Sequence, residues 1–500
     1  MNFSARQAVL LAVASAVLQV QVFPTFSYAA LAWICLAPLM YALCLRELSV
    51  RAAFWVGYLC GTLWYGGTCF WLYHTMHLYG GLSKAMSVGV AVLAGLYLGL
   101  YHGLFAVLLA RTAERSSTKI ALLVAPFLWV AVELARYHVT GVPWNLLGTA
   151  AVDNLCIAPV ARWTGVYGLS FLIALVNAAF AWAWYRRTLL NLLGALLLAG
   201  ILQTCTLYRP PASPTTHAAT LVQQNVPINP PGTWTADYFD HMIADLANMS
   251  HAPKNGAEPK LIVWPESPSP FYVTDMKFRS WMSTLATNEK SYVIAGSLGE
   301  GKSEREIYNS AVFVDPRGEF VGRYDKNRLV PFGEYVPYKD LLFFAQKLTR
   351  EVSEFSRGNH RNVFDIGAGK AGVFICYESI FPDEVRQFAR NGATVFVNIS
   401  NDGWYGPYGA PGQHLNQARM RAIENDRWVL RATNTGITAS IDPYGRVVAR
   451  AERDIRTTLD APYANVRRLT IYTRFGDWFA YLCAIISVVT IFLPRRRANE

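Results

Sequence analysis

Long runs of hydrophobic residues crowd the part of the chain before Pro210, and one more follows Trp478. A helix needs about 20 residues to cross the hydrocarbon core of a membrane, and flanking Tyr, Trp and Ser complete the shorter runs. We therefore predict eight membrane spans. They are Ala8 to Phe23, Tyr28 to Leu45, Ala52 to Tyr73, Met86 to Leu109, Ile120 to Ala135, Trp163 to Tyr185, Leu189 to Leu207 and Trp478 to Leu493.

The first run has a second interpretation, because an Arg precedes it and small residues follow near Tyr28, as in a cleaved signal peptide. The next span follows almost at once, which favours a retained helix.

The basic residues of the short loops predict the orientation of these spans. Each even-numbered span is followed by Lys or Arg, whereas the alternate loops are poor in charge. Cytoplasmic loops carry an excess of Lys and Arg, so we expect both termini in the cytoplasm. The basic residues are Arg46, Arg51, Arg111, Arg115, Lys119, Arg186, Arg187 and Arg495 to Arg497.

A proline-rich linker, Arg209 to Pro214, separates the spans from a region with a different periodicity. Short apolar runs typical of buried strands occur there at Ala219 to Gln223, Leu261 to Trp264, Tyr292 to Ser297, Ala311 to Asp315, Gly372 to Ile375, Thr394 to Ile399 and Gly436 to Ile441. Helices are expected at Thr235 to Met249, Lys277 to Asn288, Pro382 to Asn391 and Gly412 to Thr433.

This alternation predicts a layered α/β domain whose sheet is buried on both faces. We expect a transmembrane domain over 1–209 with seven spans, an external catalytic domain over 210–473, and a final span with a basic cytoplasmic tail over 474–500.

Composition supports a membrane protein, since 53% of the 500 residues are hydrophobic and only 16% are charged. A typical soluble chain carries about 25% charged residues. The net charge of +11 partly reflects the basic cytoplasmic loops, so we do not interpret it as a nucleic-acid-binding surface.

Seven of the eight cysteines lie in or beside the apolar spans, where a small buried hydrophobic residue is the plain interpretation. Cys376 is the only cysteine of the external region, so that region has no disulfide framework. Taken alone, Cys376 fits a buried structural role as well as a reactive one.

Polar clusters follow three of the predicted strands, at the strand ends where α/β sheets place ligand-binding residues. Glu266 follows one strand, Cys376 follows another, and Lys326 lies in the segment Tyr324 to Pro337. A thiol needs a base to become a thiolate, and a carboxylate in a partly dry pocket can take that role. Glu266 is the expected base. Lys326, together with the backbone N–H after Cys376, is the expected donor to a tetrahedral oxyanion.

The motifs Trp-Pro-Glu266, Asp-Lys326 and Cys376-Tyr-Glu378 resemble, in that order, the Glu-Lys-Cys triad of the nitrilase superfamily. With Leu329 to Pro337 and Asn398 to Gly406, the chain resembles bacterial apolipoprotein N-acyltransferases over essentially its full length.

This resemblance implies a polytopic membrane domain joined to an αββα sandwich in the periplasm, at the bacterial inner membrane. It also implies that a phospholipid, usually phosphatidylethanolamine, donates an acyl chain to Cys376 as a thioester. The diacylglyceryl-modified N-terminal cysteine of an apolipoprotein then accepts this chain. Glu334, Tyr377 and Glu378 match supporting positions of the family. We expect no metal ion or cofactor, and a monomer.

Several further residues are candidates for substrate contact or packing. Trp234 resembles the family's substrate-side Trp, and Trp404 is a candidate lipid contact. Other lid candidates are Phe332, Tyr335, Phe343, Phe344 and Tyr405. The segments His74 to Gly81 and Gly141 to Asn145 are interfacial anchors or a lateral portal for acyl chains. Arg427 and Arg431 with Glu424 are expected to form a structural network on one helix.

Two alternative functions remain open from the sequence. A membrane-anchored amidase of the nitrilase type would use the same triad with water as acceptor. A non-catalytic lipid-binding or transport protein would not need Cys376, but the sequence has no repeated half or mid-membrane charge pair to favour it.

Overall fold

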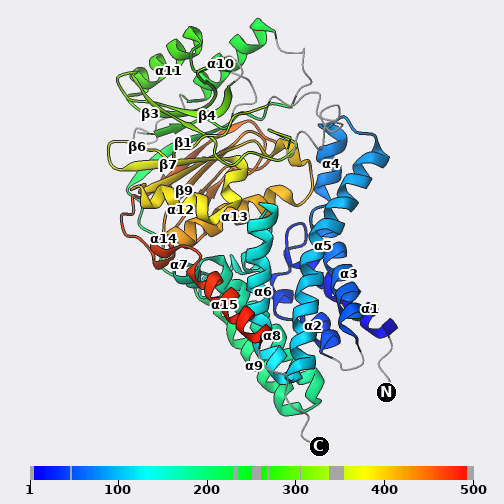
Figure 1. Ribbon diagram of the computed structural model, residues 1–500. Coiled ribbons are helices and arrows are strands. Elements are labelled where there is room, and N and C mark those ends of the chain that lie inside the picture. Colours follow the sequence, from blue (N-terminus) through cyan, green and yellow to red (C-terminus); the bar gives the residue numbers. More distant parts are fainter. Residues whose placement is uncertain are drawn as a thin grey trace, which may run out of the picture.

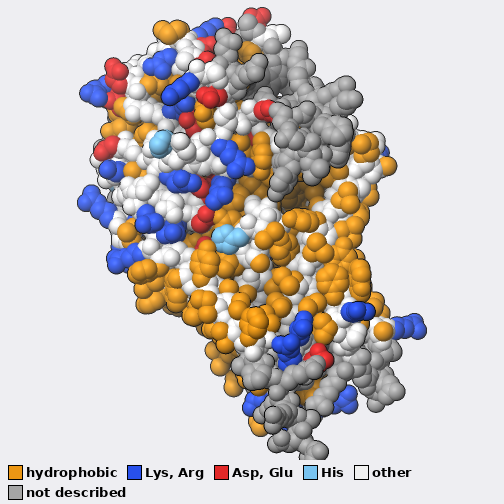
Figure 2. Space-filling view, viewed as in Figure 1, with side chains coloured by type: hydrophobic (Ala, Val, Ile, Leu, Met, Phe, Trp, Pro, Cys, Tyr) orange, Lys and Arg blue, Asp and Glu red, His pale blue; other side chains and the backbone are white. Residues whose placement is uncertain are grey.

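The computed structural model describes residues 5–44, 48–228, 235–250, 261–266, 271–303, 306–336 and 354–492. An α/β sandwich stands on one end of a bundle of long helices (Figure 1). Hydrophobic side chains cover the visible face of the bundle, whereas the sandwich carries mixed charges (Figure 2). This distribution fits a protein whose helical half lies in lipid.

The helical half follows the predicted apolar runs. Its elements are α1 Ala5–Val22, η1 Ala29–Trp33, α2 Ala37–Leu43, α3 Val50–Thr68, α4 Trp71–Leu78, α5 Lys84–Arg115, α6 Thr118–Thr140, η2 Leu147–Ala151, η3 Ala158–Val160, α7 Ala161–Thr164, α8 Val166–Arg186, α9 Leu189–Thr204, η4 Cys205–Leu207 and α15 Trp478–Ile491.

Five helices of the described part are long and apolar enough to cross a membrane: α1, α5, α6, α8, and α9 continued through η4. The segments Ala29–Leu43 and Trp478–Ile491 are shorter apolar helices. The count of eight spans therefore stays a prediction.

The second predicted span is broken into η1 and α2, and the side chain of Asn177 on α8 fills the break. Asn177 Oδ1 accepts hydrogen bonds from the backbone nitrogens of Leu36 at 2.7 Å and Ala37 at 2.9 Å. Its Nδ2 donates to the backbone oxygens of Ala32 and Ile173. Within the bundle no water is available to these backbone groups, so one buried amide satisfies the broken turn.

The sandwich consists of two six-stranded sheets. The first has the order β12-β1-β2-β3-β4-β5 and the second the order β11-β10-β9-β8-β7-β6. The strands are β1 His217–Gln223, β2 Leu261–Val263, β3 Tyr292–Glu300, β4 Ile307–Val314, β5 Phe320–Asp325, β6 Val363–Asp365, β7 Lys370–Ile375, β8 Val395–Ser400, β9 Val429–Thr433, β10 Ala439–Ile441, β11 Val447–Arg450 and β12 Thr457–Tyr463.

Helices cover the outer face of each sheet, as the predicted αββα layering requires (Figure 1). Alternate residues of β2 show why its sequence is apolar throughout. Ile262 packs under α10 and α11, whereas Leu261 and Val263 point into the contact between the sheets. The remaining helices are α10 Ala236–Ser250, α11 Met276–Glu289, η6 Cys376–Ile380, α12 Pro382–Arg390, η7 Asp402–Tyr405, α13 Ala410–Asn425 and α14 Ile471–Phe475.

The predicted helix from Gly412 to Thr433 was wrong in its second half. Helix α13 ends at Asn425, Asp426 adopts a left-handed conformation with φ of 54°, and Val429–Thr433 form the fully buried strand β9. The β-branched residues of this segment suit a strand that lies between β8 and β10.

The network expected for Arg427, Arg431 and Glu424 was wrong as well. Glu424 pairs with Arg421 on α13 at 2.9 Å, and Arg427 donates to backbone oxygens such as that of Ala393. Arg431 lies on β9 and pairs with Asp402 at 2.7 Å.

The charge-poor loops of the helical half meet the sandwich. Glu424 Oε1 accepts from the backbone nitrogen of Val166, at the start of α8, at 2.9 Å. Tyr137, near the end of α6, donates to Asp383 of α12. At the other end of the bundle, Arg115 donates to the backbone oxygen of Ile491 at 2.7 Å. The arrangement of helix ends is thus compatible with the predicted topology.

Replacing Asn177 by Leu is expected to destabilise the protein, because the backbone nitrogen of Leu36 then loses its buried acceptor, whereas that of Ala37 keeps a hydrogen bond to the Ile34 oxygen. Each unsatisfied buried group costs about 1–3 kcal/mol. The thermal unfolding midpoint in detergent should fall for Asn177→Leu. It should not fall for the control Asn191→Leu, whose side chain is partly exposed and donates a hydrogen bond to Thr188. Equal midpoints for Asn177→Leu and the unchanged protein would contradict this role.

Candidate active site

Three polar residues follow strands at the same edge of the sandwich. Glu266 follows β2, Lys326 comes directly after β5, and Cys376 comes directly after β7. Strand β5 runs parallel to β2, because β3 is parallel to β2 and two antiparallel pairings lead from β3 to β5. All three side chains are buried, with exposed fractions of 9%, 1% and 5%. The structure therefore brings the three predicted residues to one end of the sheets.

The Lys326 ammonium group lies between two carboxylates. Its Nζ is 2.9 Å from Glu334 Oε1 and 3.4 Å from Glu266 Oε1. Asn309 Nδ2 donates to the same two oxygens at 2.8 Å each. Burial alone would lower the pKa of Lys326, but the Glu334 and Glu266 carboxylates raise it above its usual value. Lys326 is therefore a fixed positive charge.

Glu266 and Glu334 are also held from the backbone side. The backbone nitrogen of Asn401 donates to Glu266 Oε2 at 2.9 Å, and that of Val330 donates to Glu334 Oε2 at 2.8 Å. Asn309, which joins the two carboxylates, was missed from the sequence. It lies in β4 without a recognisable motif around it, and only the pairing of β4 with β3 and β5 brings it to the site.

Cys376 occupies a strained turn at the end of β7. Its φ is 51°, in the left-handed region that non-glycine residues rarely adopt, at a cost of about 1–3 kcal/mol. Burial and the Glu266 carboxylate together raise the pKa of the Cys376 thiol to about 12, although Lys326 opposes the shift. The thiol is therefore protonated near neutral pH and needs a base to become a nucleophile.

The carboxylate of Glu378 ties this turn to the segment that carries Lys326. Glu378 Oε2 accepts from the backbone nitrogen of Ile375 at 2.7 Å. Its Oε1 accepts from the backbone nitrogens of Asn327 at 2.6 Å and Arg328 at 3.0 Å, and from the Tyr324 hydroxyl at 2.8 Å. Burial and the Glu384 carboxylate raise the pKa of Glu378 to about 7. Both carboxylate oxygens of Glu378 are therefore used to hold the backbone on either side of the site.

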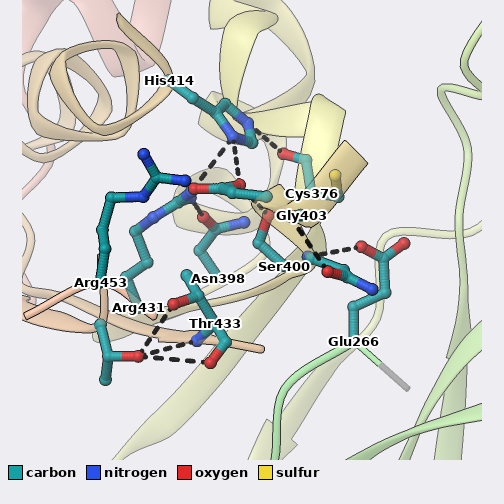
Figure 3. A network of polar contacts seen from close by, with 12 residues as sticks. Glu266, Cys376, Asn398, Ser400, Gly403, His414, Arg431, Thr433 and Arg453 are labelled. Atoms are coloured by element: carbon teal, nitrogen blue, oxygen red, sulfur yellow. Dashed lines mark hydrogen bonds and ion pairs between the residues drawn. The ribbon is translucent and has the colours of Figure 1, made fainter. Parts of the chain in front are cut away.

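A second polar network lies behind Cys376 (Figure 3). Arg431 Nη2 is 2.7 Å from Asp402 Oδ2, Ser400 donates to Asp402 Oδ1 at 2.8 Å, and His414 Nδ1 is 2.9 Å from Asp402 Oδ1. His414, Arg431 and Asp402 have no exposed surface. Although burial opposes it, Arg431 and His414 hold the pKa of Asp402 well below its usual range. The segment Asn398 to Gly406 was singled out in the sequence, whereas its partner His414 was not, and its partner Arg431 had been assigned to a different network.

The predicted substrate and lid residues fall into three groups. Trp234, Phe343 and Phe344 lie outside the described residues. Trp404 and Phe332 are exposed by 43% and 39%, so both can meet a ligand. Tyr405 is buried against Trp71, Trp144 and His414, which makes it a packing residue. Tyr377 is buried beside Phe381, and the Tyr335 backbone oxygen closes a turn with Phe332.

The segment His74 to Gly81, expected to be an anchor or a portal, contacts the catalytic end directly. Thr75 donates to the backbone oxygen of Trp404 at 2.8 Å, and the Tyr79 hydroxyl donates to that of Gly403 at 3.0 Å. The Tyr79 and Trp404 rings are 5.1 Å apart. Helix α4 therefore braces the exposed Trp404.

Together, the helical half and the Glu-Lys-Cys arrangement define a membrane protein with a catalytic domain of the carbon-nitrogen hydrolase type. Residues 218–468 match the carbon-nitrogen hydrolase family, and residues 15–179 match the apolipoprotein N-acyltransferase N-terminal domain. The chain belongs to the apolipoprotein N-acyltransferase family, and it is an acyltransferase.

Relatives of this family match the chain from end to end. The apolipoprotein N-acyltransferase of Geobacter metallireducens is 37% identical, covering 99% of this chain and 96% of its own length. That of Methylococcus capsulatus is 33% identical, covering 99% and 97%. A solved Saccharomyces cerevisiae protein of branch 10 of the nitrilase superfamily aligns with a TM-score of 0.40 at 21% identity, over 51% of this chain and 93% of that one.

Replacing Glu378 by Gln is expected to slow acyl transfer and lower the thermal midpoint. A Gln side chain has an NH₂ group in place of one carboxylate oxygen, and this group cannot accept a hydrogen bond. It would face either the backbone N–H of Ile375 or those of Asn327 and Arg328, which destabilises the fold by about 1–3 kcal/mol for each buried donor left without an acceptor. Unfolding and transfer rate should both be measured, with Glu452→Gln, an exposed residue, as the control. An unchanged transfer rate in Glu378→Gln would show that the turn does not depend on this carboxylate.

Proposed function

We propose that this enzyme carries an acyl chain from a phospholipid to the N-terminal amine of an apolipoprotein, with Cys376 as the covalent carrier. The observation that carries the proposal is a buried thiol, Cys376, at the same end of the sandwich as the Glu266–Lys326 ion pair. The sandwich stands on a bundle whose visible face is hydrophobic. Residues 15–179 match the N-terminal domain of the apolipoprotein N-acyltransferase family, and this match supports a lipid donor.

In the first step, Glu266 accepts the thiol proton of Cys376 and the thiolate attacks the ester carbonyl carbon of the phospholipid. The oxyanion that forms is stabilised by the Lys326 ammonium group and by the backbone N–H of Tyr377. When the carbon–oxygen ester bond breaks, Glu266 returns the proton to the lysophospholipid oxygen. The acyl chain is then a thioester on Cys376.

In the second step, the α-amino group of the diacylglyceryl-modified cysteine attacks the thioester carbonyl carbon. Glu266 takes a proton from the nitrogen, the carbon–sulfur bond breaks, and an amide forms. The Cys376 thiolate recovers its proton from Glu266. A thioester suits this exchange because it retains acyl-transfer potential while the donor product leaves. The reaction is the last step of lipoprotein maturation.

The proposed setting is the bacterial inner membrane, with both termini in the cytoplasm and the sandwich in the periplasm. The basic loops after even-numbered spans support this orientation. We propose phosphatidylethanolamine as the donor and a monomeric enzyme. Trp234 and Trp404 are the proposed substrate contacts, and the exposure of Trp404 beside α4 supports its part of this assignment. The proposed domain limits are residues 209/210 and 473/474.

An acyl adduct on Cys376 is the direct test. The purified protein, incubated with phosphatidylethanolamine, should gain the mass of one acyl chain in a hydroxylamine-sensitive bond, and a diacylglyceryl-cysteine peptide should then remove it. Cys376→Ala should form no adduct. Cys156→Ala, which lacks an exposed thiol elsewhere, should behave as the unchanged protein. An adduct released only to water would instead support the amidase alternative, and no adduct would end the carrier proposal.

The role of Glu266 as base predicts a change in pH dependence. In Glu266→Gln the thiol must lose its proton to solvent, and burial still keeps its pKa high. The acylation rate should therefore be low at pH 7 and rise by about tenfold per pH unit up to pH 9, following the thiolate fraction. Single-turnover acylation measured from pH 6 to 9 checks this. The control Glu300→Gln, at an exposed residue, should keep the shallower dependence of acylation rate on pH that the unchanged enzyme shows. An equally shallow dependence in Glu266→Gln would exclude Glu266 as the base.

A further inference from the structure

The carbonyl group of Cys376 is held by a side chain outside the Glu-Lys-Cys triad. The Cys376 carbonyl oxygen accepts a hydrogen bond from His414 Nε2 at 3.0 Å. A carbonyl oxygen can only accept, so Nε2 is the donor. Because Cys376 has a left-handed backbone, its conformation persists only where neighbouring groups fix it. His414 is the side chain that bonds to it on the carbonyl side, and Glu378 bonds to the backbone nitrogen of the preceding residue, Ile375.

The His414 ring is itself fixed from two directions. On one side lie Asp402 Oδ1, 2.9 Å from Nδ1, and Arg431 Nη2, 3.1 Å from Nδ1 (Figure 3). On the other side the ring stacks on Trp144, with centroids 5.9 Å apart and planes inclined by 25°, and it meets the edge of Tyr405 at 5.7 Å. These contacts on both sides hold the ring against the Cys376 carbonyl group.

Trp144 belongs to the membrane domain and is anchored there. Its backbone oxygen accepts from Arg136 Nη1, near the end of α6, at 2.8 Å. Its ring nitrogen donates to Gln413 Oε1 at 2.7 Å, and Gln413 Nε2 donates to the backbone oxygen of Thr68, at the end of α3, at 3.0 Å. Trp144 is thus bonded directly to α6, and it is connected through Gln413 to the end of α3.

The burial of Trp144 decides between the uses considered for the segment Gly141 to Asn145. Trp144 is only 3% exposed, so its ring neither anchors the protein in the lipid interface nor lines an open portal. The Trp144 side chain contacts residues of the sandwich, His414 and Gln413, and is not exposed to lipid.

We propose that His414 is a positioning residue for Cys376, and that Trp144 holds the His414 ring, so that packing of the membrane domain sets the orientation of the thiol. This inference rests on the proposed role of Cys376 as acyl carrier. A displaced carbonyl would rotate the Cys376 turn and move the thiol away from Glu266 and Lys326. The loss should appear in the acylation step itself and leave phospholipid binding unchanged.

The test is single-turnover acylation by phosphatidylethanolamine in detergent, at varied phospholipid concentration. His414→Phe keeps the ring volume and the stacking but cannot donate a hydrogen bond. Its maximal acylation rate should fall by about 10- to 100-fold, as misplacement of reacting groups does. The phospholipid concentration for half-maximal rate should stay the same. His414→Gln, whose amide can donate to the carbonyl, should recover part of the rate.

Trp144→Phe tests the connection to the membrane domain. It should lower the maximal rate by a smaller factor, again without changing the half-saturating phospholipid concentration. If Trp144 acts through His414, the double variant His414→Phe/Trp144→Phe should be no slower than His414→Phe alone, since the two effects are not additive. Gln417→Met, three residues along α13 at a buried side chain whose Nε2 has no partner, is the control and should acylate normally.

Several results would overturn the proposal. His414→Phe acylating at the unchanged rate would exclude positioning by His414. A raised half-saturating concentration in Trp144→Phe would assign that residue to substrate access, and additive losses would exclude the connection. Should His414→Phe fail to fold, His414→Gln and Trp144→Phe decide, and normal rates in both would reject the inference. Failure of the unchanged enzyme to form any adduct would instead reject the acyl-carrier function.

Discussion

The ammonium group of Lys326 is a buried charge, and the catalytic end of the sandwich is organised around it. A buried ion costs several kcal/mol unless it is paired and hydrogen-bonded. Here Glu266 and Glu334 supply the compensating charges, and Asn309 bonds to both. These residues come from four separate segments of the first sheet and its connections. The Lys326 charge is therefore compensated only where these strand ends come together. The same charged groups form the electrostatic environment of Cys376.

The second sheet contributes the thiol, and its geometry depends on contacts from both halves of the protein. Glu378 bonds the strand end before Cys376 to the segment after Lys326, so these two parts of the site are held together. His414 bonds the other side of the turn and packs on Trp144 of the membrane domain. The sandwich and the bundle thus share a core at the site, which is the expected construction for an enzyme that draws one substrate from lipid.

Sequence patterns predicted the elements that are apolar throughout or end in a motif. Strands β2, β7 and β8 were predicted because strands covered on both faces read as continuous apolar runs. Strands β5, β6, β11 and β12 were missed, since they are partly exposed and carry mixed residues. Strand β9 was assigned to a helix because it directly follows α13, and no Gly or Pro separates the two elements.

The sequence alone determined that long apolar runs precede a region of α/β periodicity, and it singled out Glu266, Lys326 and Cys376, since each lies at the end of a segment with a recognisable motif. Tertiary structure decided which distant groups complete the site. Asn309, His414 and Arg431 stand in ordinary strand and helix contexts, where nothing local distinguishes them from packing residues. Their roles arise only from sheet pairing and from the docking of the sandwich on the bundle. A hydrogen bond between segments far apart in the chain leaves no periodicity in either of them.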